Sequence, residues 1–485
     1  MINWKIIWKI ISQLLMHEAV MMLYCLGLAI YKSETSVWPF IISIGIMLAA
    51  ASGLKYAGWE SSAFMRRRES YLVVSLVWVV YSLFGALPFL IGGYISNPVD
   101  AFFETMSGFT TTGATIIDDV EVLPSSLLFW RSMTQWIGGL GIVFFTIAII
   151  PSLVGGSVQV FSAEATGPVR DKVHPRLSTT GKWIWGIYVF LTATCTAAFY
   201  LEGMSFFDSV NYAMTVTATG GFATHNASTG YFHSVAIDYT AIFYMFFSGV
   251  SFSLLYFTVF KRRFRDFFRN SELRLYLTLI GLATVGVMYF LMSYNHYSLL
   301  DALRYGLFQV VSFITTTGVF NDDAAQWHHV TWVILCVCMF FGGCSGSTSG
   351  GFKCVRGVMV LSLLRNELRR LLHPNAVMPM KVNGNTIPTS QQSTLMAFFS
   401  LYMILCLFTY FVMILTGIDS TNSFTIALSC ASNVGPTLGL EIGPTMSWSI
   451  LPDAIKLLLS LLMLMGRLEI MTVIVIFTRS FWTDK

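Results

Sequence analysis

The sequence carries little charge. Asp, Glu, Lys and Arg make up 11% of its 485 residues, whereas a soluble globular protein carries about 25%. Hydrophobic residues account for 55% of the chain, and the mean hydropathy is +0.68. A chain of this composition cannot present a water-compatible surface. The composition therefore excludes an ordinary soluble domain and predicts a polytopic membrane protein.

The residue spacings that metal sites and catalytic centres require are also missing. The eight cysteines are scattered through apolar runs without a CxxC pair, so we expect small core residues. His328 and His329, and likewise His225 and His233, have no cysteine or carboxylate at a spacing that would complete a transition-metal site. No nucleophile is paired with a base. We therefore expect neither an enzyme nor a transition-metal site.

A short run rich in hydroxyl groups and glycine occurs four times. The runs are Phe-Thr-Thr-Thr-Gly-Ala at 109–114, Val-Thr-Ala-Thr-Gly-Gly at 216–221, Ile-Thr-Thr-Thr-Gly-Val at 314–319 and Ala-Ser-Asn-Val-Gly-Pro at 431–436. The glycines taken as equivalent are Gly113, Gly220, Gly318 and Gly435. A period of about one hundred residues is too long for a solenoid repeat and suits a small membrane module.

Each run lies in the same kind of unit: a long helix, a half-length helix, the polar loop and a second long helix. The expected segments are 72–95, 100–106 and 127–150; 183–201, 207–215 and 236–260; 275–294, 300–313 and 330–364; and 395–416, 422–429 and 450–477. Two further spans, 7–31 and 37–56, precede them. The half-length segments are too short to cross a bilayer and should enter and leave on one side.

The distribution of charge predicts the orientation. The links 65–70, 161–182, 261–274 and 353–381 hold nineteen Lys or Arg residues against six Asp or Glu, whereas the spans around the four loops hold one Arg, Arg304, against twelve. By the positive-inside rule the links and the N-terminus face the cytoplasm, and the loops enter from outside. Acidic residues after two of the loops (Asp118, Asp119, Asp322, Asp323) would concentrate cations there.

The loops have the composition of a cation filter. Carbonyl and hydroxyl oxygens can replace a hydration shell, glycine permits the required dihedrals, and each half-helix would aim its negative end at the cavity. Asp100, Asp208, Asp301 and Asp419 stand where each half-helix should have its N-cap. One copy alone could be a packing motif, but four matched copies favour a filter. The predicted filter residues are Thr111, Thr112, Gly113, Ala218, Thr219, Gly220, Thr316, Thr317, Gly318, Asn433, Val434 and Gly435.

The second long helix of repeat three should break at 342–351, which reads Gly-Gly-Cys-Ser-Gly-Ser-Thr-Ser-Gly-Gly. Five glycines are poor helix formers, and broken helices in membranes commonly line the transport pathway; close small-residue packing is the alternative. The residues predicted to line the pathway here are Gly342, Gly343, Gly346, Ser347, Thr348, Ser349, Gly350, Gly351 and Arg467. Arg467 lies in an apolar run, so we expect it to face the pore and bond to carbonyls of this loop; a structural or intersubunit ion pair is the alternative. Lys353 could snorkel to the inner interface.

The sequence resembles the superfamily of potassium transporters that includes TrkH, TrkG and KtrB. Besides the four repeats, the resemblance rests on Arg-Ser-Met-Thr-Gln-Trp-Ile-Gly-Gly-Leu-Gly at 131–141, on Asp-Ala-Leu-Arg-Tyr at 301–305 and on Phe-Gln-Val-Val-Ser at 308–312. It implies an all-α fold with four helix–pore-loop–helix repeats around a central pore, preceded by two extra helices. The expected divisions are 1–64, 65–160, 161–268, 269–381 and 382–485.

The resemblance also implies function and partners. It implies potassium uptake across a bacterial inner membrane, with the 342–351 loop obstructing the pore below the filter and Arg467 as part of that gate. Glycine at position 113 favours potassium, since serine there goes with sodium selectivity in related plant transporters. It further implies a homodimer and a cytoplasmic TrkA-like ring that binds the regulatory nucleotide in place of this chain; no nucleic-acid partner is expected.

A second interpretation is a proton- or sodium-coupled transporter on the same scaffold. Coupling requires titratable or ion-binding residues at mid-membrane, and the sequence offers few apart from Glu104 and Arg467. We therefore favour a channel-like pathway.

Overall fold

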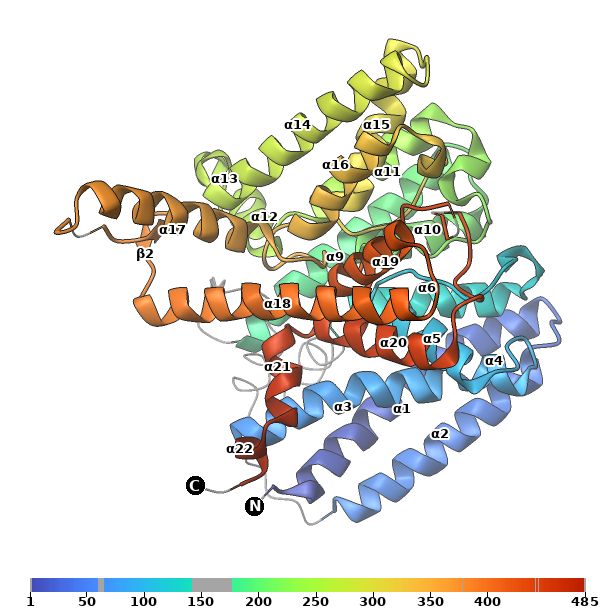
Figure 1. The fold of residues 1–485 in the computed structure, drawn as a ribbon. Coiled ribbons are helices and arrows are strands. Elements are labelled where there is room, and N and C mark those ends of the chain that lie inside the picture. The colour runs from blue at the N-terminus through green and yellow to red at the C-terminus, as the bar shows by residue number, and fades with distance from the viewer. Residues whose placement is uncertain are drawn as a thin grey trace.

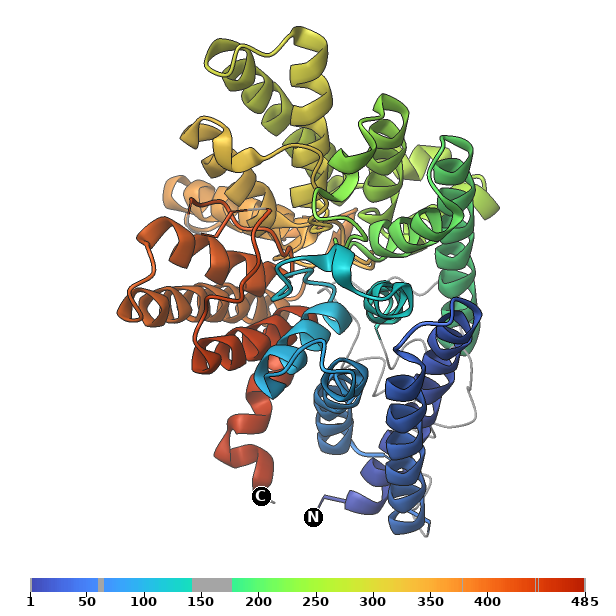
Figure 2. The same ribbon diagram turned by 90° about the vertical axis from the view of Figure 1, so that its right-hand side faces the viewer.

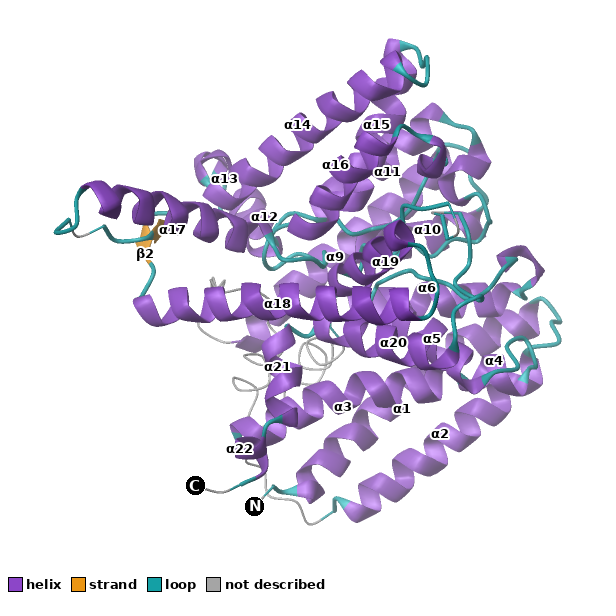
Figure 3. Ribbon diagram, in the orientation of Figure 1, coloured by secondary structure: helices purple, strands orange, loops and turns teal. Residues whose placement is uncertain are grey.

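The computed structural model describes residues 2–59, 65–141, 177–376, 378–440, 442–443 and 445–483, which are predominantly helical (Figure 3). Two short strands, β1 (Lys381–Val382) and β2 (Asn385–Thr386), form a hairpin in the link before the fourth repeat. Its turn residues, Asn383 and Gly384, both have positive φ, the conformation that an Asn-Gly hairpin turn requires. The predicted all-α class is confirmed.

Two N-terminal helices form a pair beside the first repeat (Figure 1). They are α1 (Trp4–Tyr31) and α2 (Val37–Ala57), and both begin and end within a few residues of the predicted spans. Helix α1 also packs against the first long helix and the second helix of repeat one. These extra helices therefore cover one side of that repeat.

The four repeats follow in chain order. Repeat one contains α3 (Arg67–Gly85), α4 (Leu87–Ile91), α5 (Pro98–Phe109) and α6 (Ser125–Gly139). Repeat two contains α9 (Leu177–Leu201), α10 (Phe206–Ala218), α11 (Val235–Ser248), α12 (Phe252–Phe260) and the short α13 (Phe264–Arg269). Repeat three contains α14 (Ser271–Ser293), α15 (Leu299–Ile314), α16 (His329–Phe341) and α17 (Cys354–Leu372). Repeat four contains α18 (Thr389–Leu415), α19 (Ser420–Ser432), α20 (Asp453–Arg467), α21 (Ile470–Ile474) and α22 (Arg479–Trp482).

The prediction that the second helices of repeats two and four are continuous is wrong. Helices α11 and α12 meet at a bend of 98°, and α20 and α21 at 117°. In repeat three the expected break lies between α16 and α17. In repeat one α6 ends at Gly139, short of the predicted end at residue 150, and residues 142–150 lie outside the described residues. The sequence does not indicate these bends because the runs 236–260 and 450–477 are mainly apolar on both sides of the bend, and hydropathy carries no information on the direction of a helix.

The half-length helices α5, α10, α15 and α19 are capped, but three of the four predicted caps are displaced. Asn97 caps α5, Ser205 caps α10 and Ser298 caps α15, each accepting a bond from a backbone N–H of the first turn. In these helices the acidic residue lies within the first turn instead, where it still favours the positive helix end. In α19 Asp419 is the cap itself.

The four repeats surround one centre. Seen along the view of Figure 2, their helices form four groups in chain order, blue-cyan, green, yellow and orange-red, and their loops meet in the middle. Two apolar clusters hold this arrangement: one joins α1–α6 to repeat four, and the other joins repeats two and three. Six of the described helices are long and apolar enough to cross a bilayer, and each bent pair could add one span. Exposed apolar side chains such as Ile404, Phe408 and Phe411 on α18 fit a lipid-facing surface.

A buried ion pair ties repeat four back to repeat one. The Lys456 ammonium on α20 lies 2.6 Å from the Asp100 carboxylate on α5 and also donates to the Ser449 carbonyl. Only 3% of the Lys456 side chain is exposed. Asn97, the cap of α5, donates to Asp453 in the first turn of α20. The first and last repeats are thus joined at the same end of the two helices.

We predict that Lys456→Met destabilises the protein by about 3 kcal/mol or more, since it leaves the Asp100 carboxylate without its cation. Adding Asp100→Asn should restore much of the loss, because both charges are then gone. Thermal unfolding of the detergent-solubilised protein measures both effects. If the double variant is destabilised by the sum of the losses of the two single variants, the pairing is contradicted.

Candidate functional site

The four loops share one backbone conformation. In each loop a non-glycine residue with φ of 54–56° is followed two positions later by a glycine with positive φ. The non-glycine residues are Thr111, Thr219, Thr316 and Asn433, and the glycines are Gly113, Gly221, Gly318 and Gly435. The N–H of the residue between them donates to the half-helix in every repeat, over 2.9–3.0 Å: Thr112 to Ser107, Gly220 to Thr215, Thr317 to Ser312 and Val434 to Ser429.

This shared conformation corrects the predicted register of the second loop. The glycine equivalent to Gly113 is Gly221, not Gly220, so the predicted set is displaced by one residue in repeat two. Ala218 is the last residue of α10, and the triplet that matches the other loops is Thr219, Gly220 and Gly221. Two adjacent glycines made the sequence alignment ambiguous, and the backbone dihedrals resolve it.

The four glycines close a ring. A Cβ atom added at any of them would lie 2.1–2.3 Å from a backbone carbonyl oxygen of the next loop, a distance that no side chain can accept. The contacts join Gly113 to Gly220, Gly221 to Thr317, Gly318 to Val434 and Gly435 to Thr112. Each loop therefore touches the next, and the fourth touches the first. Glycine is required here by close approach as well as by φ.

The hydroxyl groups within the ring are unequally distributed. In repeats one and three a threonine pair braces the loop: Thr110 and Thr112 lie 2.8 Å apart, and Thr315 and Thr317 lie 2.7 Å apart. In repeat four Asn433 instead donates to the Thr112 hydroxyl of repeat one over 3.0 Å and to the Met463 carbonyl over 2.9 Å. The ring is therefore four-fold in its backbone and less symmetric in its side chains.

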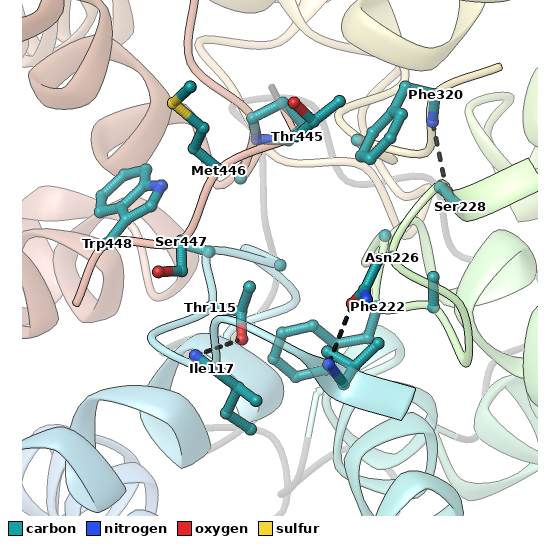
Figure 4. A pocket seen from close by; sticks show the side chains of 18 of the residues that line it. Thr115, Ile117, Phe222, Asn226, Ser228, Phe320, Thr445, Met446, Ser447 and Trp448 are labelled. Atoms are coloured by element: carbon teal, nitrogen blue, oxygen red, sulfur yellow. Dashed lines mark hydrogen bonds between the residues drawn. The ribbon is translucent and has the colours of Figure 1, made fainter. Parts of the chain in front are cut away.

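A pocket lies against one side of the ring (Figure 4). All four ring glycines line it, together with residues from the outer loop of every repeat, among them Thr115, Phe222, Phe320 and Ser447. Its floor is therefore the ring itself. The figure shows side chains from the four differently coloured parts of the chain facing this one space.

Of the four acidic residues expected near the entrance, Asp118 lines the pocket. Hydrogen bonds from Ser447 and Ser449 lower the pKa of Asp118, so this carboxylate stays charged at neutral pH. The others serve the outer loops: Asp119 accepts from Asn226, and Asp322 accepts from Tyr297 and Trp327. Asp323 accepts from the Ala325 N–H.

A buried ion pair supports the first half-helix from behind. The Glu104 carboxylate on α5 accepts from Arg131 Nε on α6 over 2.8 Å and from the Ile116 N–H over 2.9 Å. Arg131 also donates to the Ala223 carbonyl of the second loop over 3.2 Å, and its guanidinium lies over the Phe222 ring. This pair joins two neighbouring repeats, and no local sequence pattern indicates it.

On the other side of the ring lies the loop at 342–353. The Gly350 N–H donates to the Thr316 hydroxyl over 2.6 Å, and the Thr348 hydroxyl donates to the Thr217 carbonyl over 3.1 Å. A Cβ at Gly350 would lie 2.2 Å from the Ser432 carbonyl. The loop thus contacts the ends of three half-helices, directly against the ring.

Arg467 joins this loop to the first repeat. Its guanidinium donates to the Thr348 carbonyl over 2.7 Å and to the Gly138 carbonyl at the end of α6 over 2.8 Å, with a further bond to Gly139. The end of a helix carries partial negative charge, so the cation is well placed. Glu469 pairs instead with Arg356 on α17.

The expectation that Lys353 snorkels to the inner interface is wrong. Its side chain is 3% exposed, and its ammonium donates to the Ser349 carbonyl within the same loop. The free backbone carbonyls of a non-helical loop offer a nearer partner than the interface. Lys353, Arg356 and Arg467 therefore place three cationic side chains around one loop. Among the described residues, no cluster of histidine, cysteine, aspartate and glutamate could hold a metal ion.

Comparison with known proteins gives one consistent result. A family model described as TrkH, cation transport protein, matches residues 39–484. The chain is 36% identical to the Trk system potassium uptake protein TrkH of Halomonas elongata, over 99% of both chains, and 33% identical to TrkG of Escherichia coli, over 94% of this chain and 93% of that one.

The structural comparison agrees. The crystal structure of the potassium transporter TrkH from Vibrio parahaemolyticus superposes with a TM-score of 0.90 at 32% identity, covering 99% of this chain and 100% of that one. The expected resemblance is confirmed. The chain is a multi-pass membrane transporter and not an enzyme. The chain belongs to the TrkH family of cation transport proteins.

Proposed function

We propose that this chain carries potassium into the cell across the bacterial inner membrane, through the ring formed by its four loops. The closed ring of glycine–carbonyl contacts is the observation that carries the proposal. It brings polar backbone from all four repeats around one centre, with a pocket on one side of it. The names of the curated relatives, which are potassium uptake proteins, support the choice of ion.

The potassium ion is the substrate of this pathway. The alternation between positive and negative φ at positions such as 111–113 turns successive peptide groups toward one side of the chain. We expect their carbonyl oxygens, with threonine hydroxyls, to replace the hydration shell. With the corrected register the filter residues are Thr111, Thr112, Gly113, Thr219, Gly220, Gly221, Thr316, Thr317, Gly318, Asn433, Val434 and Gly435.

The loop at 342–353 would act as a gate on the inner side of the ring. Its contacts with Thr316 and Thr217 hold it against the filter, and Arg467 holds it to α6. Positive charge at this point would oppose passage of a cation. Opening would require these few bonds to be exchanged, which a conformational change in α17 or α20 could achieve.

Coupling to protons or sodium is the less favoured mechanism. Glu104 and Arg467, the two residues that the sequence offered for coupling, are both engaged in hydrogen bonds that hold the filter and the loop in place. Uncoupled inward movement of a cation would gain about 2.3 kcal/mol per 100 mV of membrane potential.

The cytoplasmic partner and the homodimer belong to the same proposal. Helix α17 extends away from the body of the molecule (Figure 1) and exposes Arg369 and Arg370 beside Leu371 and Leu372. A basic and apolar surface of this kind suits a protein contact. We expect the partner to be a TrkA-like ring that binds the regulatory nucleotide.

The proposal is tested with proteoliposomes that contain the purified chain, under an imposed potential and without a proton or sodium gradient. Potassium uptake that exceeds sodium uptake is the expected result. Uptake that appears only when a proton or sodium gradient is added would support the coupled mechanism. Equal uptake of both ions would contradict potassium selectivity.

We predict that Gly113→Ser lowers the potassium-to-sodium permeability ratio about tenfold, equivalent to about 1.4 kcal/mol. The added Cβ would press on the Gly220 carbonyl and distort the ring. Gly417→Ser is the matched control, since Gly417 also has a positive φ of 89° but nothing lies within 4 Å of its Cβ position. The filter assignment would be contradicted if the permeability ratio is unchanged in Gly113→Ser, or if Gly113→Ser and Gly417→Ser lower it equally.

We predict that Arg467→Ala raises potassium flux severalfold in the absence of a cytoplasmic partner, because the loop loses its bonds to α6 and the pathway loses a positive charge. Flux per folded protein in proteoliposomes measures the change. Arg304→Ala is the control: it removes a part-buried arginine that pairs with Asp238 instead. Lower or unchanged flux at normal protein levels would contradict the gate.

A further inference from the structure

The second loop differs from the other three at one position. The residue before the ring glycine is Thr112, Thr317 or Val434 in repeats one, three and four, but Gly220 in repeat two. Gly220 does not have the positive φ of its neighbour Gly221, so its backbone conformation does not call for glycine. Another constraint must exclude a side chain here.

The side chain of Gln135 is that constraint. A Cβ at Gly220 would lie 2.4 Å from Gln135 Cδ and 2.5 Å from Oε1. Gln135 belongs to α6 of repeat one and is fully buried. A side chain from the preceding repeat therefore occupies the space that the loop's own side chain fills elsewhere in the ring.

Gln135 also forms the bonds that the second loop lacks. Its Nε2 donates to the Gly220 carbonyl over 2.6 Å, and its Oε1 accepts from the Phe222 N–H over 3.0 Å. Only one orientation of the amide satisfies both bonds. The two bonds hold the peptide groups on either side of Gly221. In repeats one and three the corresponding turn is braced by a threonine pair, whereas repeat two has Ala218 and Gly220 at these positions.

The bonded carbonyl belongs to the ring. Gly220 O is the atom that Gly113 approaches, so the Gln135 bond fixes the contact between loops one and two. Arg131, one helical turn earlier on the same face of α6, holds the Ala223 carbonyl farther out along the second loop. One face of α6 thus positions the second loop at both its inner and its outer part.

We propose that Gln135 is a positioning residue for ion selectivity: its amide replaces the missing side chain of the second loop and holds that loop in register with the first. This inference rests on the proposed function of the ring as a potassium filter. If one loop of the ring is free to shift, the ring can adapt to either ion, and its preference for potassium over sodium becomes smaller. Losing the two bonds should lower the potassium-to-sodium ratio about threefold to tenfold.

The first test is Gln135→Met, which keeps the length of the side chain and removes both bonds. Permeability ratios are measured in proteoliposomes beside the wild-type chain. A lower ratio at a similar amount of folded protein supports the proposal, and an unchanged ratio overturns it. Gln309→Met is the control: Gln309 is equally buried but donates to the Asp322 carbonyl outside the ring. An equal fall in this variant would also overturn the proposal.

The second test exchanges the two side chains. Gly220→Thr alone should damage the ring, since the threonine would collide with Gln135. Gln135→Ala combined with Gly220→Thr should recover discrimination, because it gives repeat two the residue that Thr112 and Thr317 provide in their loops. A double variant whose potassium-to-sodium ratio is no higher than that of the lower single variant would overturn the proposal. This exchange serves as the test if Gln135→Met does not fold.

The outcomes also separate this inference from the function on which it rests. If the wild-type chain shows no preference for potassium, the proposed function fails whatever Gln135 does. If the wild type discriminates and both Gln135 tests fail, only the positioning role is lost.

Discussion

The structure depends on four turns of irregular backbone that are buried at the centre of a membrane transporter. Non-helical peptide groups within a bilayer must be covered by protein or by water, because lipid offers them no hydrogen bonds. The protein meets this requirement by setting the four turns against one another, so that each ring glycine rests on a carbonyl of the next loop. The turns cannot be separated without exposing polar backbone, and the repeats are therefore bound to a common centre.

The helices around the ring follow from the same constraint. Each half-helix ends at the ring, and its first turn is capped at the outer end by Asn97, Ser205, Ser298 or Asp419. The second helices of repeats two, three and four bend or break below the ring, and α6 ends at the same level. In repeat three the break is extended into a glycine- and serine-rich loop. There Arg467, Lys353 and the Arg356–Glu469 pair gather, so these four charged side chains lie against the loop and not within the ring.

Much of this architecture could be predicted from the sequence. Long apolar runs located the outer helices, and a repeated hydroxyl–glycine pattern located the four loops. The break at 342–351 could be predicted because glycine is a poor helix former. The bend after Ser248 and the one after Arg467 could not, since apolar composition is the same on either side of a bend. The caps of α5, α10 and α15 were each misplaced by three residues, because an acid in the first turn and a cap have similar sequence signals.

The ring shows where sequence patterns no longer suffice. Gly220 and Gly221 are indistinguishable as letters, and only φ and the contact with Thr317 identify the ring glycine. The interactions of Gln135 and of the Glu104–Arg131 pair join residues that are far apart along the chain, so no local pattern reveals them. A signal did exist: the two long polar side chains of α6, Arg131 and Gln135, are four residues apart and so indicate a face turned toward polar neighbours.

The most direct test of the central claim is to locate the ion. A crystal of the protein grown in rubidium, a heavier analogue of potassium, would be measured for anomalous scattering, with a sodium-grown crystal as the reference. If potassium passes through the ring, a peak should appear on the axis enclosed by Gly113, Gly221, Gly318 and Gly435, and it should be absent from the sodium crystal. Rubidium found only in the outer pocket or between helices, with none inside the ring, would contradict it.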